Sequence, residues 1–162
     1  TISRGSILIS SFVSQALALL IYNLGLWGVS YGMAALQPDF DAASFALACL
    51  SLYFSYFMVE VMYLAIGYLL SVFLSHSSQA SAAAFAVLLA SLLLGIVGGA
   101  IPALGWMLFL SPYHYINTGL VLESAMLGAP AGVFPYALIC LIFSLILGAL
   151  ACVRYYFKDF NV

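Results

Sequence analysis

Four long stretches of the chain are almost continuously apolar, and short polar or proline-containing segments separate them. These stretches cover about residues 6–36, 43–75, 80–101 and 133–155. A helix needs about 20 apolar residues to cross the roughly 30 Å hydrocarbon layer of a bilayer. Each stretch is long enough, so the pattern predicts an all-α fold, a polytopic membrane helix bundle with four transmembrane helices.

The segment 102–132 breaks this regularity and predicts an external re-entrant helical hairpin. The run from Ala103 to Leu110 is apolar but too short to cross, and Pro112 breaks the chain just after it. A second short helix is expected over 117–127. Apolar pieces of about 10–14 residues suit re-entrant or interfacial elements. The alternative is one continuous span over 103–122, which Pro112 in its middle argues against.

The second stretch carries one carboxylate, Glu60, near the middle of its apolar run. An ionisable group at that depth needs a partner, a wet cavity or a proton. Polar and small residues share its helical face at steps of three and four: Tyr53, Tyr56, Tyr63 and Gly67. This stripe is the first candidate for a surface that faces a substrate pathway.

Two interpretations of Glu60 stay open. In the functional one, Glu60 binds a cation or carries a proton. In the structural one, it is protonated, or bonded to Tyr56, Tyr63 or Gln15, within a packed bundle. Gln15 lies on the polar face of the first stretch and is a further pathway candidate.

Two features of the first stretch predict helix packing. Gly25, Gly28 and Gly32 form a ridge of small residues with one GxxxG spacing, and we expect it to mark packing within the chain. Tyr22 and Asn23 lie in the middle of the span, where a polar side chain is expected to hydrogen-bond a neighbouring helix.

Composition supports a membrane protein and excludes several other classes. Hydrophobic residues make up 67% and charged residues 5% of the chain, whereas a soluble domain carries roughly a quarter charged residues. No basic patch is present for nucleic acid. The three cysteines and two histidines have no metal-ligand spacing and form no catalytic constellation. We therefore expect no metal site, no catalytic residues and no enzymatic activity.

Charge predicts the topology. With four spans both termini lie on one side, and that side carries all three basic residues, Arg4, Arg154 and Lys158. The positive-inside rule makes it cytoplasmic. Asp39 and Asp41 fall on the other side. The chain opens on Thr1 rather than Met, and we expect a segment of a longer polypeptide.

Three motifs resemble the back half of the transmembrane domain of type-2 ATP-binding-cassette (ABC) exporter permeases. They are the start Ile2-Ser3-Arg4-Gly5-Ser6-Ile7-Leu8, the polar loop 75–79, and Leu110-Ser111-Pro112-Tyr113-His114-Tyr115-Ile116, which is similar to the family's "LSPFHY" stretch. The resemblance implies that the four spans correspond to the family's third to sixth. It also implies a re-entrant turn at Ser111, Pro112, Tyr113 and His114, where His114 would cap or pack the turn.

The resemblance further implies a plasma membrane protein, in the inner membrane of a bacterium, whose partners are an ABC ATPase subunit and a second permease copy. No GxxxxGK[ST] phosphate loop is present, so ATP would bind the partner subunit and this chain would hold no cofactor. The family's first two spans and coupling helix would precede Thr1. The alternative function is a non-transporting four-span scaffold or assembly subunit.

Overall fold

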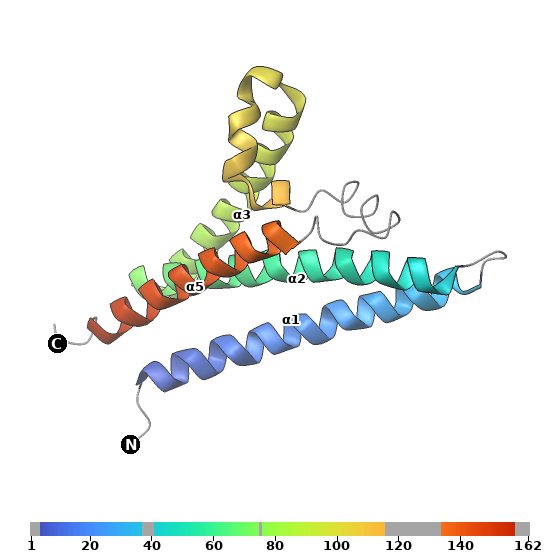
Figure 1. The fold of residues 1–162 in the computed structure, drawn as a ribbon. Coiled ribbons are helices and arrows are strands. Elements are labelled where there is room, and N and C mark those ends of the chain that lie inside the picture. Colours follow the sequence, from blue (N-terminus) through green and yellow to red (C-terminus); the bar gives the residue numbers. More distant parts are fainter. Residues whose placement is uncertain (1–3, 37–40, 75, 116–133, 158–162) are drawn as a thin grey trace.

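The computed structural model describes residues 4–36, 41–74, 76–115 and 134–157, and every regular element in these ranges is helical (Figure 1). The elements are α1 (Arg4–Ala34), α2 (Ala42–Phe73), α3 (Ser77–Ala100), the 3-10 helices η1 (Pro102–Leu110) and η2 (Pro112–Tyr115), and α5 (Phe134–Phe157). The predicted all-α fold is confirmed.

Four of these helices are long and apolar enough to cross a membrane. The candidate spans are Ser6–Ala34, Phe45–Phe73, Ser78–Ala100 and Ala137–Phe157. Inside hydrocarbon, backbone N–H and C=O groups must bond within the chain, which a helix achieves along its whole length. The chain is therefore a multi-pass membrane protein, as the hydropathy pattern predicts.

Short polar and proline-containing sequences set the helix boundaries. The Asp41 carboxylate accepts a hydrogen bond from the backbone N–H of Ala43 at 3.2 Å and so caps α2. At the far end of α3, Ile101 adopts an extended conformation and Pro102 begins η1. Proline suits the first position of a helix because it lacks the N–H that would stay unbonded there.

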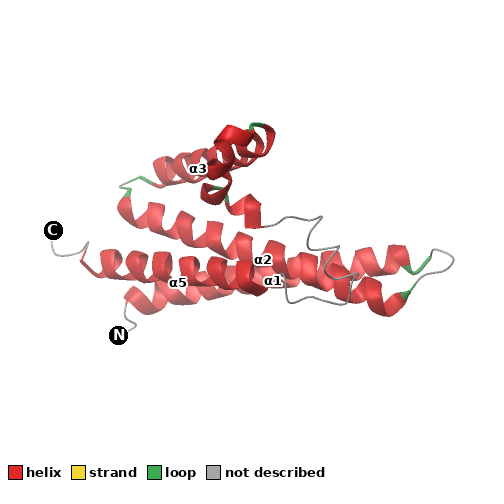
Figure 2. Cartoon of the chain, turned by 45° about the horizontal axis from the view of Figure 1, so that its top comes forward, coloured by secondary structure: helices red, strands yellow, loops and turns green. Residues whose placement is uncertain are grey.

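Helix α2 is the centre of the bundle. It packs most extensively against α5 and next against α1, and these three helices lie side by side (Figures 1 and 2). The buried side chains of α5 are small: Ala137, Cys140, Ser144 and Ala151. Small side chains let two membrane helices approach closely, so van der Waals packing can hold α5 against α2.

The start of α1 and the end of α5 lie at the same end of the bundle (Figure 1). At that end the Arg154 guanidinium stands over the ring of Phe73, the last residue of α2, at 5.5 Å from its centroid. A cation placed over an aromatic face is attracted to it. This contact joins the C-terminal ends of α2 and α5.

The segment after α3 folds back on it, and α3 with η1 forms a hairpin at the side of the bundle (Figure 1). The helical conformation is interrupted at Ser111, between η1 and η2, so one continuous helix over 103–122 is excluded. The described part of the predicted re-entrant segment consists of the two short helices η1 and η2, which pack against α3. The helix expected over 117–127 lies outside the described residues.

Two glycines of α3 allow the two arms of this hairpin to pack closely. A Cβ on Gly98 would lie 3.0 Å from the backbone nitrogen of Leu108, and one on Gly95 would lie 3.0 Å from the Ser111 hydroxyl oxygen. Real Cβ atoms rarely come so near. The two glycines therefore let η1 and the Ser111 turn rest directly on the α3 backbone.

The packing predicted for the glycine ridge of α1 is wrong for the described residues. A Cβ added at Gly25, Gly28 or Gly32 would meet no heavy atom within 4 Å. The ridge lies on the side of α1 opposite Asn23, which is buried. A small-residue pattern shows where a helix can come close, but it does not identify the helix that does so.

The hairpin gives a direct test with a matched pair of glycines. Gly98→Ala should destabilise the protein by about 1–3 kcal/mol, because the new methyl group overpacks against the backbone of η1. Gly99→Ala adds the same methyl group to the next residue, where nothing lies within 4 Å, and should be neutral or slightly stabilising. Thermal unfolding in bilayer nanodiscs measures both. Equal behaviour of the two variants would contradict the close packing of η1 on α3.

Candidate functional site

Polar contacts join α1 and α2 along most of their length. The pairs are Ser11 with Tyr68 at 2.6 Å, Asn23 with Glu60 at 2.5 Å, the Trp27 indole with the Ala46 carbonyl at 3.3 Å, and Ser30 with Tyr53 at 2.6 Å. From Ser11 to Ser30 along α1, the partners on α2 run back from Tyr68 through Glu60 to Tyr53 and Ala46, so the two helices are antiparallel. We call this row of contacts the polar seam.

Glu60 lies in the middle of the seam. The Asn23 side-chain amide donates one hydrogen bond to Glu60 Oε2 at 2.5 Å and another to the Leu19 carbonyl at 3.0 Å. Asn23 is only 3% exposed. The prediction that Asn23 bonds a neighbouring helix is confirmed, whereas Tyr22 beside it is exposed. Glu60 thus has a described hydrogen bond with Asn23, a partner that was not among the expected ones, Gln15, Tyr56 and Tyr63.

One polar atom in this region has no partner in the described part of the chain. Asn23 Oδ1 is buried and accepts no hydrogen bond there. A cavity of about 50 Å³ adjoins Asn23, Trp27 and Tyr53 between α1 and α2. This volume is far below the roughly 300–1,000 Å³ of small-molecule sites, so the cavity does not fit an organic cargo.

The remaining tyrosines of the stripe face other neighbours. The Tyr63 hydroxyl is hydrogen-bonded to the Ser91 hydroxyl of α3, and its ring lies 5.7 Å from that of Tyr113. The half-buried Tyr56 has its ring 6.3 Å from that of Tyr53. The predicted stripe therefore contacts α1 on one side and the α3 hairpin on the other.

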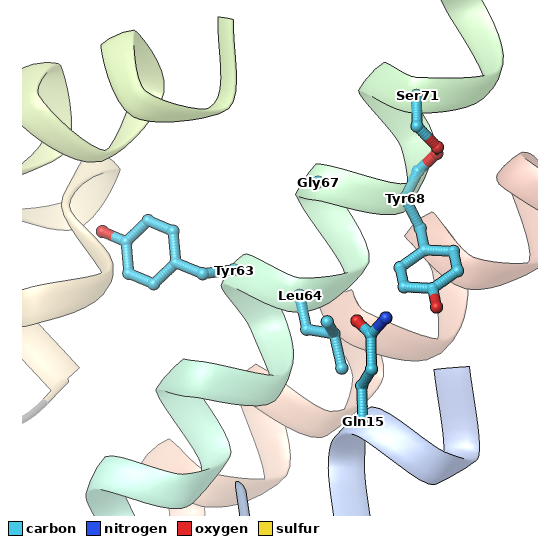
Figure 3. Close-up of a pocket in the computed structure, with 6 residues that line it drawn as sticks. All are labelled: Gln15, Tyr63, Leu64, Gly67, Tyr68 and Ser71. Atoms are coloured by element: carbon cyan, nitrogen blue, oxygen red, sulfur yellow. The ribbon is translucent and has the colours of Figure 1, made fainter. Parts of the chain in front are cut away.

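A groove of about 370 Å³ lies beside the seam, between α1 and α2 (Figure 3). Its lining residues are Gln15, Tyr63, Leu64, Gly67, Tyr68 and Ser71. Figure 3 shows Gln15, Leu64 and Tyr68 gathered on one side of α2, while the Tyr63 side chain points the opposite way. This groove is large enough for a small molecule or a lipid headgroup.

The structure brings two pathway candidates, Gln15 and Tyr63, to this groove, together with Gly67 of the stripe. Glu60, Tyr53 and Tyr56 do not line it. Sequence reasoning missed Tyr68 and Ser71. Their signal was present, because Leu64, Tyr68 and Ser71 follow steps of four and three residues and share a helical face next to the stripe.

The predicted turn residues hold the segment that follows α3 against that helix. Ser111 is fully buried, and its hydroxyl donates to the Ser91 carbonyl at 2.7 Å. Pro112 is also buried, and the ring of Tyr113 lies tilted against that of Tyr63. His114 packs edge-on against Phe109, with ring centroids 5.4 Å apart, in keeping with the packing role expected for it.

Comparisons with models of known protein families, with curated proteins and with solved structures gave no match. The function is therefore inferred from the chain's own residues and geometry.

The Asn23–Glu60 pair can be tested with a double-mutant cycle. Asn23→Leu and Glu60→Leu should each destabilise the protein by about 1–3 kcal/mol, because each leaves a polar group unpaired between helices. The double variant should recover most of this loss, since both partners become apolar. Thermal unfolding in nanodiscs gives the four stabilities.

Tyr22→Leu serves as the control for this cycle, because Tyr22 is exposed next to Asn23 and should change little. Purely additive losses in the double variant would show that Asn23 and Glu60 do not interact.

Proposed function

We propose that the chain is part of the membrane-spanning permease of an ABC-type exporter. It forms a translocation pathway with a second permease copy, and a separate ATPase subunit drives it. The support is twofold: four helices are apolar and long enough to span, and the short helices η1 and η2 that follow the third of them fold back against it.

The position of the Ser111-Pro112-Tyr113-His114 turn carries this proposal. From the resemblance to type-2 permeases, we expect such a sequence in an outer hairpin just beyond a span. Here the turn lies beside α3, with Ser111 buried and bonded to the Ser91 carbonyl. An apolar segment that doubles back instead of crossing fits a re-entrant element, as its short length predicts.

The proposed orientation has both termini in the cytosol. Arg154 lies at the end of the bundle where α1 begins and α5 ends (Figure 1). Arg4 and Lys158 flank the same helix ends in the sequence, and positive residues favour the cytoplasmic side. The membrane would be the plasma membrane, which is the inner membrane in a bacterium.

A second candidate function is a non-transporting membrane scaffold. The polar seam favours it, because Glu60 and Tyr53 are bonded to α1 and do not line the 370 Å³ groove. In a scaffold these residues would serve only to join helices. The presence of a coupled ATPase separates the two candidates.

The orientation predicts which positions a membrane-impermeant thiol reagent can reach. Leu36→Cys, exposed just beyond the end of α1, should react only from outside, and His76→Cys, exposed between α2 and α3, only from inside. Intact cells and inverted vesicles provide the two sides. The native cysteines lie within helices and are replaced by Ala in both variants. Labelling of both positions from one side would contradict the four-span topology.

The permease proposal predicts that a phosphate-loop ATPase co-purifies with this chain and that cargo stimulates its ATP hydrolysis. Glu60→Gln should keep folding and ATPase coupling, because Gln retains an oxygen that accepts from Asn23, while transport changes. Transport identical to that of the parent would remove Glu60 from the pathway. A stable chain that copurifies with no ATPase would favour the scaffold.

A further inference from the structure

We propose that the groove between α1 and α2 binds the uncharged, hydroxyl-bearing headgroup of an amphiphile. The groove is the one lined by Gln15, Tyr63, Leu64, Gly67, Tyr68 and Ser71. As the cargo class of the permease this inference rests on the proposed function, but as a binding site it can be tested without transport.

The lining selects against charge. Beside Leu64 and Gly67 it holds the Gln15 amide, the Tyr68 phenol and the Ser71 hydroxyl, and the described lining residues include no acidic or basic side chain. The carboxylate of Glu60 is bonded to Asn23, and the Arg154 guanidinium stands over Phe73. A charged headgroup would lose its hydration here without gaining a counter-charge, which is strongly unfavourable in a medium of low dielectric constant. A neutral headgroup avoids that loss.

Gln15 supplies the recognition group. Its side chain is exposed and makes no hydrogen bond with the residues that the structure describes. It lies about 13 Å along the helix from Ser6, where the apolar span begins, and so at membrane depth. An amide needs both donors and acceptors, and lipid chains offer neither. Hydroxyl groups of a headgroup supply both at once.

The aromatic wall of the groove is held in place before a ligand arrives. The Tyr68 hydroxyl is bonded to Ser11 at 2.6 Å, and its ring meets Phe12 edge-on at 5.4 Å. A fixed ring loses little conformational entropy on binding. The apolar faces of a sugar-like ring pack well against such a surface.

The volume limits what enters. About 370 Å³ is at the low end of small-molecule sites and is too little for a whole lipid. The alkyl chain would remain outside the groove, in the hydrocarbon layer of the membrane. The site therefore selects on the headgroup.

Gly67 offers a way to close the groove, and Gly25 a matched control. A Cβ at either glycine meets no heavy atom within 4 Å, so a leucine can be added without a clash. Gly67 lines the groove, whereas Gly25 lies on α1 away from it. Gly67→Leu should fill the groove, and Gly25→Leu should leave it open.

The test is photo-crosslinking in membrane vesicles that contain the full chain. The probe is a decyl glucoside with a diazirine on its alkyl chain, and mass spectrometry locates the labelled residues. Labelling should concentrate on α1 and α2 next to the groove. Unlabelled decyl glucoside should compete, whereas decyl sulfate, decyltrimethylammonium and free glucose should not. Gly67→Leu and Gln15→Leu should weaken probe binding about tenfold, and Gly25→Leu should not.

Equal competition by the three decyl compounds would overturn the proposal, because the groove would then hold any alkyl chain. Labelling unchanged by Gly67→Leu would overturn it as well. Thermal unfolding of each variant confirms that it is folded. No ATPase takes part in this measurement, so a failed copurification contradicts the permease alone, and a failed crosslink contradicts the ligand assignment alone.

Discussion

The fold depends on the need to satisfy a carboxyl group inside a membrane helix. Lipid offers Glu60 no hydrogen-bond donor, so the donor must come from the protein. Asn23 provides it across the α1–α2 interface at 2.5 Å, while its second amide hydrogen bonds the Leu19 carbonyl of its own helix. Because Asn23 is fixed at both hydrogens, the pair sets both the rotation of α1 and its level along α2.

The two neighbours of α2 are held by different forces. Apolar surface alone cannot hold one membrane helix to another, since lipid chains are equally apolar. Helix α5 meets α2 through small buried side chains, including Ala137 and Cys140, and so by close packing. Helix α1 has its glycine ridge turned away and meets α2 through hydrogen bonds. We infer that removing polar groups would loosen α1 before α5.

The sequence predicted what each helix needs, but not which partner supplies it. The helices were predictable because apolar runs of this length can satisfy their backbone only as helices. The importance of Glu60 followed from its isolation. Its partner Asn23, 37 residues away, depends on the register of two helices, which hydropathy does not define. Because hydropathy does not define which faces of two helices meet, the expectation for Gly25, Gly28 and Gly32 was also wrong.

The groove is a consequence of where the seam is interrupted. Between its contacts at Ser11 and Asn23, α1 runs about 18 Å without a described hydrogen bond to α2. Gly67 contributes no side chain to that interval, so the two helices leave a space there instead of packing. The hydrogen bonds at either end of this interval fix the distance between α1 and α2. A seam that is closed at both ends and open between them gives a pre-formed site, and Gln15 is the polar group that remains inside it.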